Sequence, residues 1–198
     1  MMMEFGHIRR MQDARFPHEV AVIMPGEYFV SQDPMIVYTV LGSCVSVCIR
    51  DTVLEIGGMN HFMLATPTGD AAPDRWGTSA RYGNFAMEVL VNEILKRGGR
   101  RNRLEVKVFG GGRICEGVSN IGAQNVAWVL DYLEQEGLCP VKADVGDIFP
   151  RKVYYFTESG RVLLKKLDRV EHLAIAEDEQ VYHSTLARKI SKGDVTLF

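Results

Sequence analysis

Residues 39–64 read TVLGSCVSVCIRDTVLEIGGMNHFML, and we expect the rest of the chain to be organised around them. Apolar and polar side chains alternate over residues 45–49, which is the period-two pattern of a half-buried β-strand. A second β-rich run follows the polar break at residues 51–52 and leads to His61. If the two runs pair as an antiparallel hairpin, the start of one lies beside the end of the other. The pattern therefore predicts that Cys44 and His61 lie close together.

A thiol beside an imidazole is the minimum set of groups for an activated sulfur nucleophile. Histidine titrates near neutral pH without any shift, so Cys44 is the candidate nucleophile and His61 the candidate general base. An imidazolium close to Cys44 is expected to lower the pKa of the thiol. The alternative is that both side chains are packing residues of the core.

Three further cysteines are present. Cys48 follows Cys44 at a spacing that also suits a metal site, but no second Cys or His pair at zinc-like spacing accompanies them. We therefore expect Cys48 to be a core residue and predict no metal site. Cys115 and Cys139 stand apart, and all four thiols are expected to be free.

Size and composition limit the possible functions. The chain has 198 residues, of which 46% are hydrophobic, and this suits a single substantial core. A net charge of −2 provides no overall attraction to nucleic acid or to an anionic membrane. No apolar run approaches the roughly 20 residues of a membrane span, and the opening residues lack the apolar core of a signal peptide. We expect a cytoplasmic protein that neither binds nucleic acid nor inserts into a membrane.

Strands with two inserted helices predict an α/β layered domain with a large mixed sheet. We expect an extension that is loosely held over residues 1–19, a domain over residues 20–168, and a tail over residues 169–198. In the helices, Phe85 and Leu130 are expected to face inward. Besides the hairpin, strands are expected at residues 19–24, 27–30, 35–40, 104–109, 141–145, 152–157 and 161–167, and helices at residues 82–97 and 122–136.

The glycine tract at residues 110–112 has neither the Lys-Ser/Thr ending nor the immediate helix of a phosphate-binding loop. We interpret it as a place of close backbone packing near the site. A long loop over residues 65–79, which carries Arg75 and Trp76, is expected to form one wall of a substrate site.

Several short blocks stand in order along the sequence. They are LGSCV at residues 41–45, GGMNHFML at 57–64, RYG at 81–83, VFGG at 108–111, and NIGA at 120–123 followed by Asn125. Together these blocks resemble the CheD family of chemoreceptor glutamine deamidases, and the similarity extends from about residue 25 to about residue 167. The resemblance implies a β-sandwich-like mixed-sheet core with helices packed outside, similar to the catalytic domains of cytotoxic necrotizing factor toxins.

The resemblance also implies a function and site residues. It implies a hydrolase that converts glutamine side chains of methyl-accepting chemotaxis receptors to glutamate, with Cys44 as nucleophile and His61 as base and without a cofactor. The family uses a threonine a few residues before the cysteine to orient the imidazole, which suggests Thr39, with Tyr38 as the alternative. Candidates for contacts to the substrate or to the oxyanion are Ser43 and Asn60.

Two other functions remain open from the sequence. A CheD-like protein can act as a binding module that docks on receptors, or on a CheC-type phosphatase, without turnover. A cysteine protease or a transglutaminase shares the Cys-His chemistry but differs in the leaving group or the acceptor.

Overall fold

The structure is a computed structural model that describes residues 5–64, 77–114, 121–167, 179–182 and 184–186. Its helices are α1 (Gly77–Lys96) and α2 (Ile121–Gln135), with a short 3-10 turn η1 (Arg101–Arg103). Its strands are β1 (Arg9–Met11), β2 (Val20–Val22), β3 (Tyr28–Ser31), β4 (Ile36–Leu41), β5 (Val45–Asp51), β6 (Gly57–Asn60), β7 (Leu104–Gly110), β8 (Pro140–Val145), β9 (Arg151–Phe156) and β10 (Val162–Lys166).

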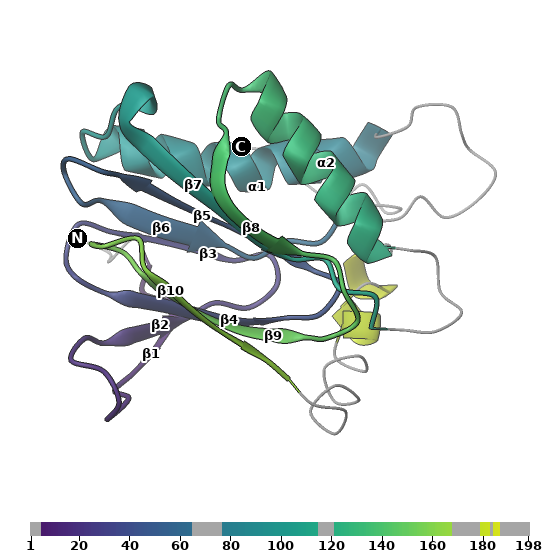
Figure 1. Cartoon of the computed structure of the whole chain (residues 1–198), viewed down its shortest axis with the longest axis horizontal. Helices are drawn as coiled ribbons and strands as arrows, with labels where there is room; N and C mark the ends of the chain where they lie inside the picture. The colour runs from purple at the N-terminus through teal and green to yellow at the C-terminus, as the bar shows by residue number, and fades with distance from the viewer. Residues whose placement is uncertain (1–4, 65–76, 115–120, 168–178, 183, 187–198) are drawn as a thin grey trace.

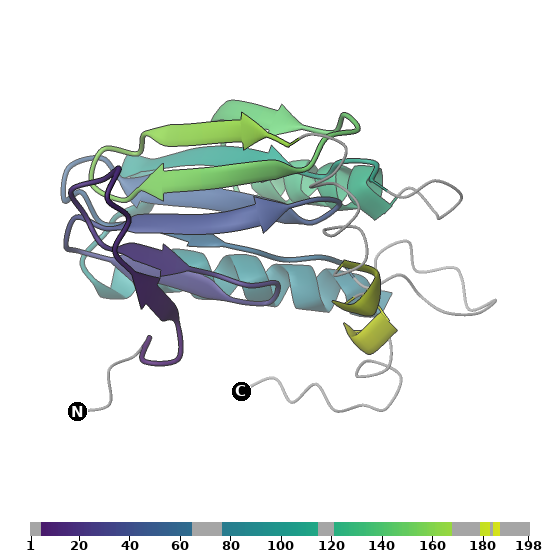
Figure 2. The ribbon, with the colours of Figure 1, turned by 90° about the horizontal axis from the view of Figure 1, so that it is seen from below.

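The strands form two five-stranded sheets that pack face to face (Figure 1). The first sheet has the order β1-β2-β4-β9-β10 and the second the order β3-β6-β5-β7-β8. Viewed from the side of the first sheet, α1 and α2 lie behind the second sheet and cover its outer face (Figure 2). Each sheet is mixed, because β2 pairs parallel to β4 and β7 parallel to β8 while the other pairs are antiparallel. The predicted α/β class is confirmed, although the strands divide between two sheets instead of forming one.

Strand β5 lies at the centre of the second sheet, between the first sheet and the helices. Six of its seven residues are buried, so its alternating sequence pattern understates its burial. It pairs antiparallel with β6, with Cys48 opposite Met59, and a bridge from Val45 to Phe62 extends the pairing. The predicted hairpin is therefore confirmed.

The helices were predicted close to their observed positions, but part of each expected inward face is wrong. Phe85 in α1 is 41% exposed and Leu130 in α2 is 38% exposed, while Met87 and Trp128 are buried in their place. Packing against the second sheet decides which face of each helix is buried. The spacing of apolar residues alone was compatible with more than one buried face.

The terminal segments contribute more than expected. Phe5 and Ile8 are buried in the main core, and β1 pairs antiparallel with β2, so residues 5–11 are not a loose extension. Residues 179–182 and 184–186 are helical, and we call them the C-terminal segment. Of the expected loop, residues 77–79 belong to α1, whereas Arg75 and Trp76 lie outside the described residues.

Candidate active site

The thiol of Cys44 and the imidazole of His61 meet between the two sheets. Cys44 follows the turn that joins β4 to β5, and His61 is the first residue after β6. Because β5 and β6 pair antiparallel, the two residues come together, with Cys44 Sγ and a ring nitrogen of His61 within 4.8 Å. Both side chains are buried, with exposed fractions of 0% and 3%.

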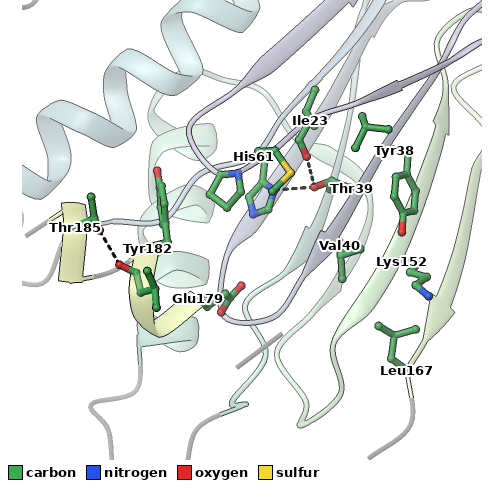
Figure 3. A pocket seen from close by; sticks show the side chains of 14 residues that line it. Ile23, Tyr38, Thr39, Val40, His61, Lys152, Leu167, Glu179, Tyr182 and Thr185 are labelled. Atoms are coloured by element: carbon green, nitrogen blue, oxygen red, sulfur yellow. Dashed lines mark hydrogen bonds between the residues drawn. The ribbon is translucent and has the colours of Figure 1, made fainter. Parts of the chain in front are cut away.

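A chain of two hydrogen bonds fixes the orientation of the imidazole (Figure 3). Thr39 Oγ1 lies 2.8 Å from the carbonyl oxygen of Ile23 and 2.7 Å from His61 Nδ1. The carbonyl can only accept, so the single hydroxyl proton of Thr39 goes to Ile23. The hydroxyl oxygen must then accept from Nδ1–H of His61. This places the proton of the neutral imidazole on Nδ1 and leaves a lone pair on Nε2.

The free nitrogen of the ring suits a base. Within the described part of the chain, Nε2 of His61 is buried and makes no hydrogen bond. A buried nitrogen without a partner is costly unless a function requires it. With Nδ1 occupied by Thr39, Nε2 is the nitrogen left to take a proton from Cys44.

Alternation along β4 explains why the contact to His61 comes from Thr39. Val37 and Leu41 point into the core between the sheets, and Thr39 shares their face. Tyr38 points to the opposite face of the sheet, where its ring packs against Tyr154 with centroids 4.5 Å apart.

Residues 42–44, which we call the nucleophile turn, are fixed by hydrogen bonds to their backbone carbonyls. The N–H groups of Gly111 and Gly112 donate to the carbonyls of Cys44 and Gly42, each at 2.7 Å. Between them, the side-chain amide of Asn125 in α2 donates to the carbonyl of Ser43 at 2.8 Å. With its carbonyls engaged by the protein, the turn presents three consecutive N–H groups to the site.

The glycine tract at residues 110–112 allows this close contact, as predicted. Gly110 has a φ of 108°, and a Cβ there would lie 2.2 Å from the carbonyl oxygen of Cys44. Any side chain at this position would push the tract away from the nucleophile turn.

The three N–H groups of the turn converge on the carboxylate of Glu179 in the C-terminal segment. Donor–acceptor distances are 2.9 Å from Gly42, 2.7 Å from Ser43 and 3.2 Å from Cys44. The Ser43 hydroxyl adds a fourth hydrogen bond of 2.5 Å. The turn is therefore an anion-binding site of the kind that stabilises an oxyanion.

Burial and charge keep the thiol protonated in this arrangement. Burial raises the pKa of Cys44 well above its usual value, and the negative charge of Glu179 raises it further. Burial lowers the pKa of His61, although the charge of Glu179 acts in the opposite direction. Burial therefore favours the neutral thiol and the neutral imidazole over the ion pair. The expectation that an imidazolium lowers the pKa of Cys44 is wrong for this arrangement, in which burial and Glu179 raise that pKa.

Two other predicted positions have structural contacts. The Asn60 side chain accepts a hydrogen bond from the Val47 N–H and donates one to the Ala86 carbonyl, both at 2.9 Å. Asn60 therefore connects β5 with α1, and its amide is engaged within the fold. Cys48 is 1% exposed among core side chains.

Among the described residues, the donor atoms of Cys44, His61 and Glu179 lie close enough to one another to hold a metal ion. Thiolate, imidazole and carboxylate are ligands that zinc uses. Here, however, hydrogen bonds from the nucleophile turn already engage both oxygens of Glu179. Cys44, Cys48 and Cys139 are free thiols, and Cys115 lies outside the described residues.

A largely apolar cavity of about 730 Å³ opens beside the imidazole. His61 and Thr39 form part of its wall, and the C-terminal segment closes another side with Glu179 and Tyr182 (Figure 3). The remaining lining comes from the ends of β2 and β4, from Lys152 and from Leu167. The imidazole of His61 therefore lies in the wall of this cavity, although its exposed fraction is only 3%.

Comparison with known proteins identifies the family. A family model described as CheD chemotactic sensory transduction matches residues 63–166. A protein of Thiobacillus denitrificans named probable chemoreceptor glutamine deamidase CheD is 48% identical over 188 residues, which is 94% of this chain and 93% of the relative. The chain belongs to the CheD family. CheD 1 proteins of the same description from Dechloromonas aromatica and Shewanella oneidensis are 50% and 48% identical over 191 residues, covering 96% of this chain and 94% and 92% of their own lengths.

Sequence reasoning missed two polar residues at the site of this CheD-family chain. Asn125 was part of the family resemblance, but nothing in its neighbourhood indicated that it holds the Cys44 turn. Glu179 lies 135 positions from Cys44, in a segment without a recognisable motif.

No helix of the described residues is long and apolar enough to cross a membrane.

Proposed function

We propose that this protein hydrolyses the side-chain amide of glutamine residues in chemotaxis receptors, producing glutamate and ammonia. The observation that carries the proposal is the buried Cys44–His61 pair beside three converging N–H groups. The names of the relatives, chemoreceptor glutamine deamidases, support the same substrate class.

In the proposed first step, Nε2 of His61 takes the thiol proton while the sulfur of Cys44 attacks the carboxamide carbon. The amide oxygen becomes an oxyanion, which N–H groups of residues 42–44 stabilise. His61 then gives its proton to the departing nitrogen, the C–N bond breaks, and ammonia leaves behind a thioester.

The second step consumes water. His61, neutral again, takes a proton from a water molecule that attacks the thioester carbon. The C–S bond breaks, His61 returns its proton to the sulfur of Cys44, and the substrate side chain leaves as glutamate. Thr39 acts as a positioning residue in both steps, because its hydroxyl keeps the proton of the neutral ring on Nδ1 and directs Nε2 toward Cys44.

We leave Asn60 out of the proposed oxyanion site, because both ends of its amide are bonded within the fold. Ser43 stays in the proposal, because its N–H and hydroxyl both face the anion.

Further parts of the proposal rest on the family resemblance. They are a cytoplasmic location beside the receptor helices, docking of a CheC-type phosphatase, and kinship of the fold with cytotoxic necrotizing factor catalytic domains. The two stacked sheets with helices outside are compatible with the last of these.

Incubation with purified cytoplasmic domains of methyl-accepting receptors tests the function. We expect ammonia release in step with the conversion of particular glutamines to glutamate, mapped by tandem mass spectrometry. Backbone cleavage would indicate a protease, and cross-linking would indicate a transglutaminase. Receptors that bind but stay unmodified would favour the binding-module function.

A further inference from the structure

Glu179 fills the anion-binding site with a side chain that the proposed reaction itself produces. Deamidation converts glutamine to glutamate, and the two side chains have the same length and branching. Oε1 of Glu179 accepts hydrogen bonds from the N–H groups of Gly42 and Cys44, and Oε2 accepts from the N–H and hydroxyl of Ser43. A glutamine in this position would present its amide oxygen to one of these two pairs of donors, as a substrate amide would.

The reacting groups lie within reach of this carboxylate. One carboxylate oxygen of Glu179, Cys44 Sγ and a ring nitrogen of His61 all lie within 4.8 Å of one another. Glu179 is buried, at 7% exposed, and its carboxylate accepts four hydrogen bonds from residues 42–44. A buried carboxylate requires hydrogen-bond donors, and the nucleophile turn supplies them to Glu179.

We propose that Glu179 is an intramolecular mimic of the deamidation product, and that the C-terminal segment occupies the place of the receptor segment that carries the target glutamine. The inference rests on the proposed function and deepens it, since it identifies the binding site of the substrate side chain. With the C-terminal segment in this place, the protein without bound receptor is inhibited by its own chain.

The form of the C-terminal segment agrees with this role. Residues 179–182 and 184–186 are helical, so Glu179 enters the site from a helix, as a glutamine on a receptor helix would. The segment is anchored by a 3.0 Å hydrogen bond between the hydroxyls of Tyr182 and Tyr82 and by the buried side chain of Leu186. These contacts bring the segment onto the catalytic domain at the end of the sheets where β4 leads into β5 (Figure 1).

Occupation by the segment has a direct consequence for the nucleophile. Cys44 is 0% exposed, and the negative charge of Glu179 further disfavours its thiolate. A receptor glutamine can reach Cys44 only after Glu179 has left. The receptor glutamine and Glu179 therefore compete for the hydrogen-bond donors of the nucleophile turn.

The substitution Glu179→Gln turns the mimic into a tethered substrate, and this provides a sharp test. We expect the full-length variant to convert the introduced glutamine to glutamate, with water consumed and ammonia released. The rate should be first order and independent of protein concentration, because the reaction is intramolecular. The neighbouring Gln180 is exposed, and it serves as an internal control that stays unconverted in the same peptide.

The same variant in a Cys44→Ala background should retain the introduced glutamine. Conversion that persists without Cys44, or equal conversion of Gln180, would overturn the inference. So would an introduced glutamine that stays intact in a protein that deamidates receptor domains, and the proposed function would then still stand. If neither the introduced glutamine nor the receptor is converted, both the inference and the proposed function are wrong.

A second variant tests self-inhibition. Glu179→Ala removes the mimic, and we expect alkylation of Cys44 by iodoacetamide to become on the order of tenfold faster, because hydrogen bonds to a charged group no longer hold the site closed. Gln180→Ala, the matched control, should react like wild type. The idea is wrong if Glu179→Ala is folded and its Cys44 reacts no faster than in wild type.

Discussion

Replacing Thr39 with valine tests how the imidazole is held. Valine keeps the branched shape but removes Oγ1, which bonds to His61 Nδ1 at 2.7 Å and to the Ile23 carbonyl at 2.8 Å. Both partners would then lose the hydroxyl in an interior where Thr39 is only 2% exposed. A buried polar group that loses its partner costs about 1–3 kcal/mol.

The expected loss of activity follows from the same free-energy cost. If the cost of one unsatisfied group falls on the orientation of His61 in the transition state, kcat for receptor deamidation falls by about 10- to 100-fold, since about 1.4 kcal/mol corresponds to a factor of ten. KM should change little, because Thr39 lies behind the imidazole and does not contact the anion-binding turn. The free energy of unfolding should fall by about 1–3 kcal/mol, which a domain of this size tolerates.

Thr39→Ser is the matched control, because serine keeps the hydroxyl and loses only a methyl group. We expect the serine variant to recover most of kcat, measured as initial rates of ammonia release from receptor cytoplasmic domains. Thermal unfolding of both variants separates loss of fold from loss of orientation. A valine variant with wild-type kcat, or a folded serine variant as slow as valine, would refute the proposed role of the hydroxyl.

Three further outcomes are expected. Cys48→Ala should keep near wild-type activity and lose about 1 kcal/mol of stability, because Cys48 only fills the core; a large loss of activity would contradict this. Prolonged chelation with EDTA should leave deamidation unchanged, whereas inactivation that zinc reverses would assign a metal to the Cys44 cluster. Burial alone would raise the pKa of Asp51, but backbone N–H groups and Arg103 outweigh it and hold the pKa at about 2. The depressed pKa contributes about 2 kcal/mol above pH 4, lost as the pH falls toward 2, so Asp51→Asn should flatten acid unfolding in this window; an unchanged curve would contradict it.

The sequence was sufficient for the centre of the site because that part depends on local pattern. Alternation over residues 45–49 and the following polar break predicted the β5–β6 hairpin, and the hairpin alone brings Cys44 to His61. The same period-two rule distinguishes Thr39 from Tyr38 once the inward face of β4 is known. The sequence could not identify that face, since β4 has apolar residues on both sides.

The remaining features depend on contacts between distant segments. Glu179 reaches the nucleophile turn from far along the chain, and a single glutamate in a charged, patchily apolar stretch gives no signal of this contact. The protonation state of Cys44 likewise depends on complete burial and on the charge of Glu179, neither of which a local pattern reveals. Phe85 was misplaced for a related reason, because the packing of α1 against the sheet decides which face is buried.

The most direct test of the account is capture of the thioester on Cys44. Hydroxylamine attacks thioesters, so its addition to a reaction with receptor cytoplasmic domains should divert the acyl group to a hydroxamate at the same glutamine positions that otherwise become glutamate. Quenched samples of the wild-type protein should carry the receptor peptide on Cys44, and Cys44→Ala should give no adduct, hydroxamate or glutamate. Glutamate formed by the Cys44→Ala protein at the wild-type rate would contradict the account, as would wild-type conversion without hydroxamate or an adduct on Cys44.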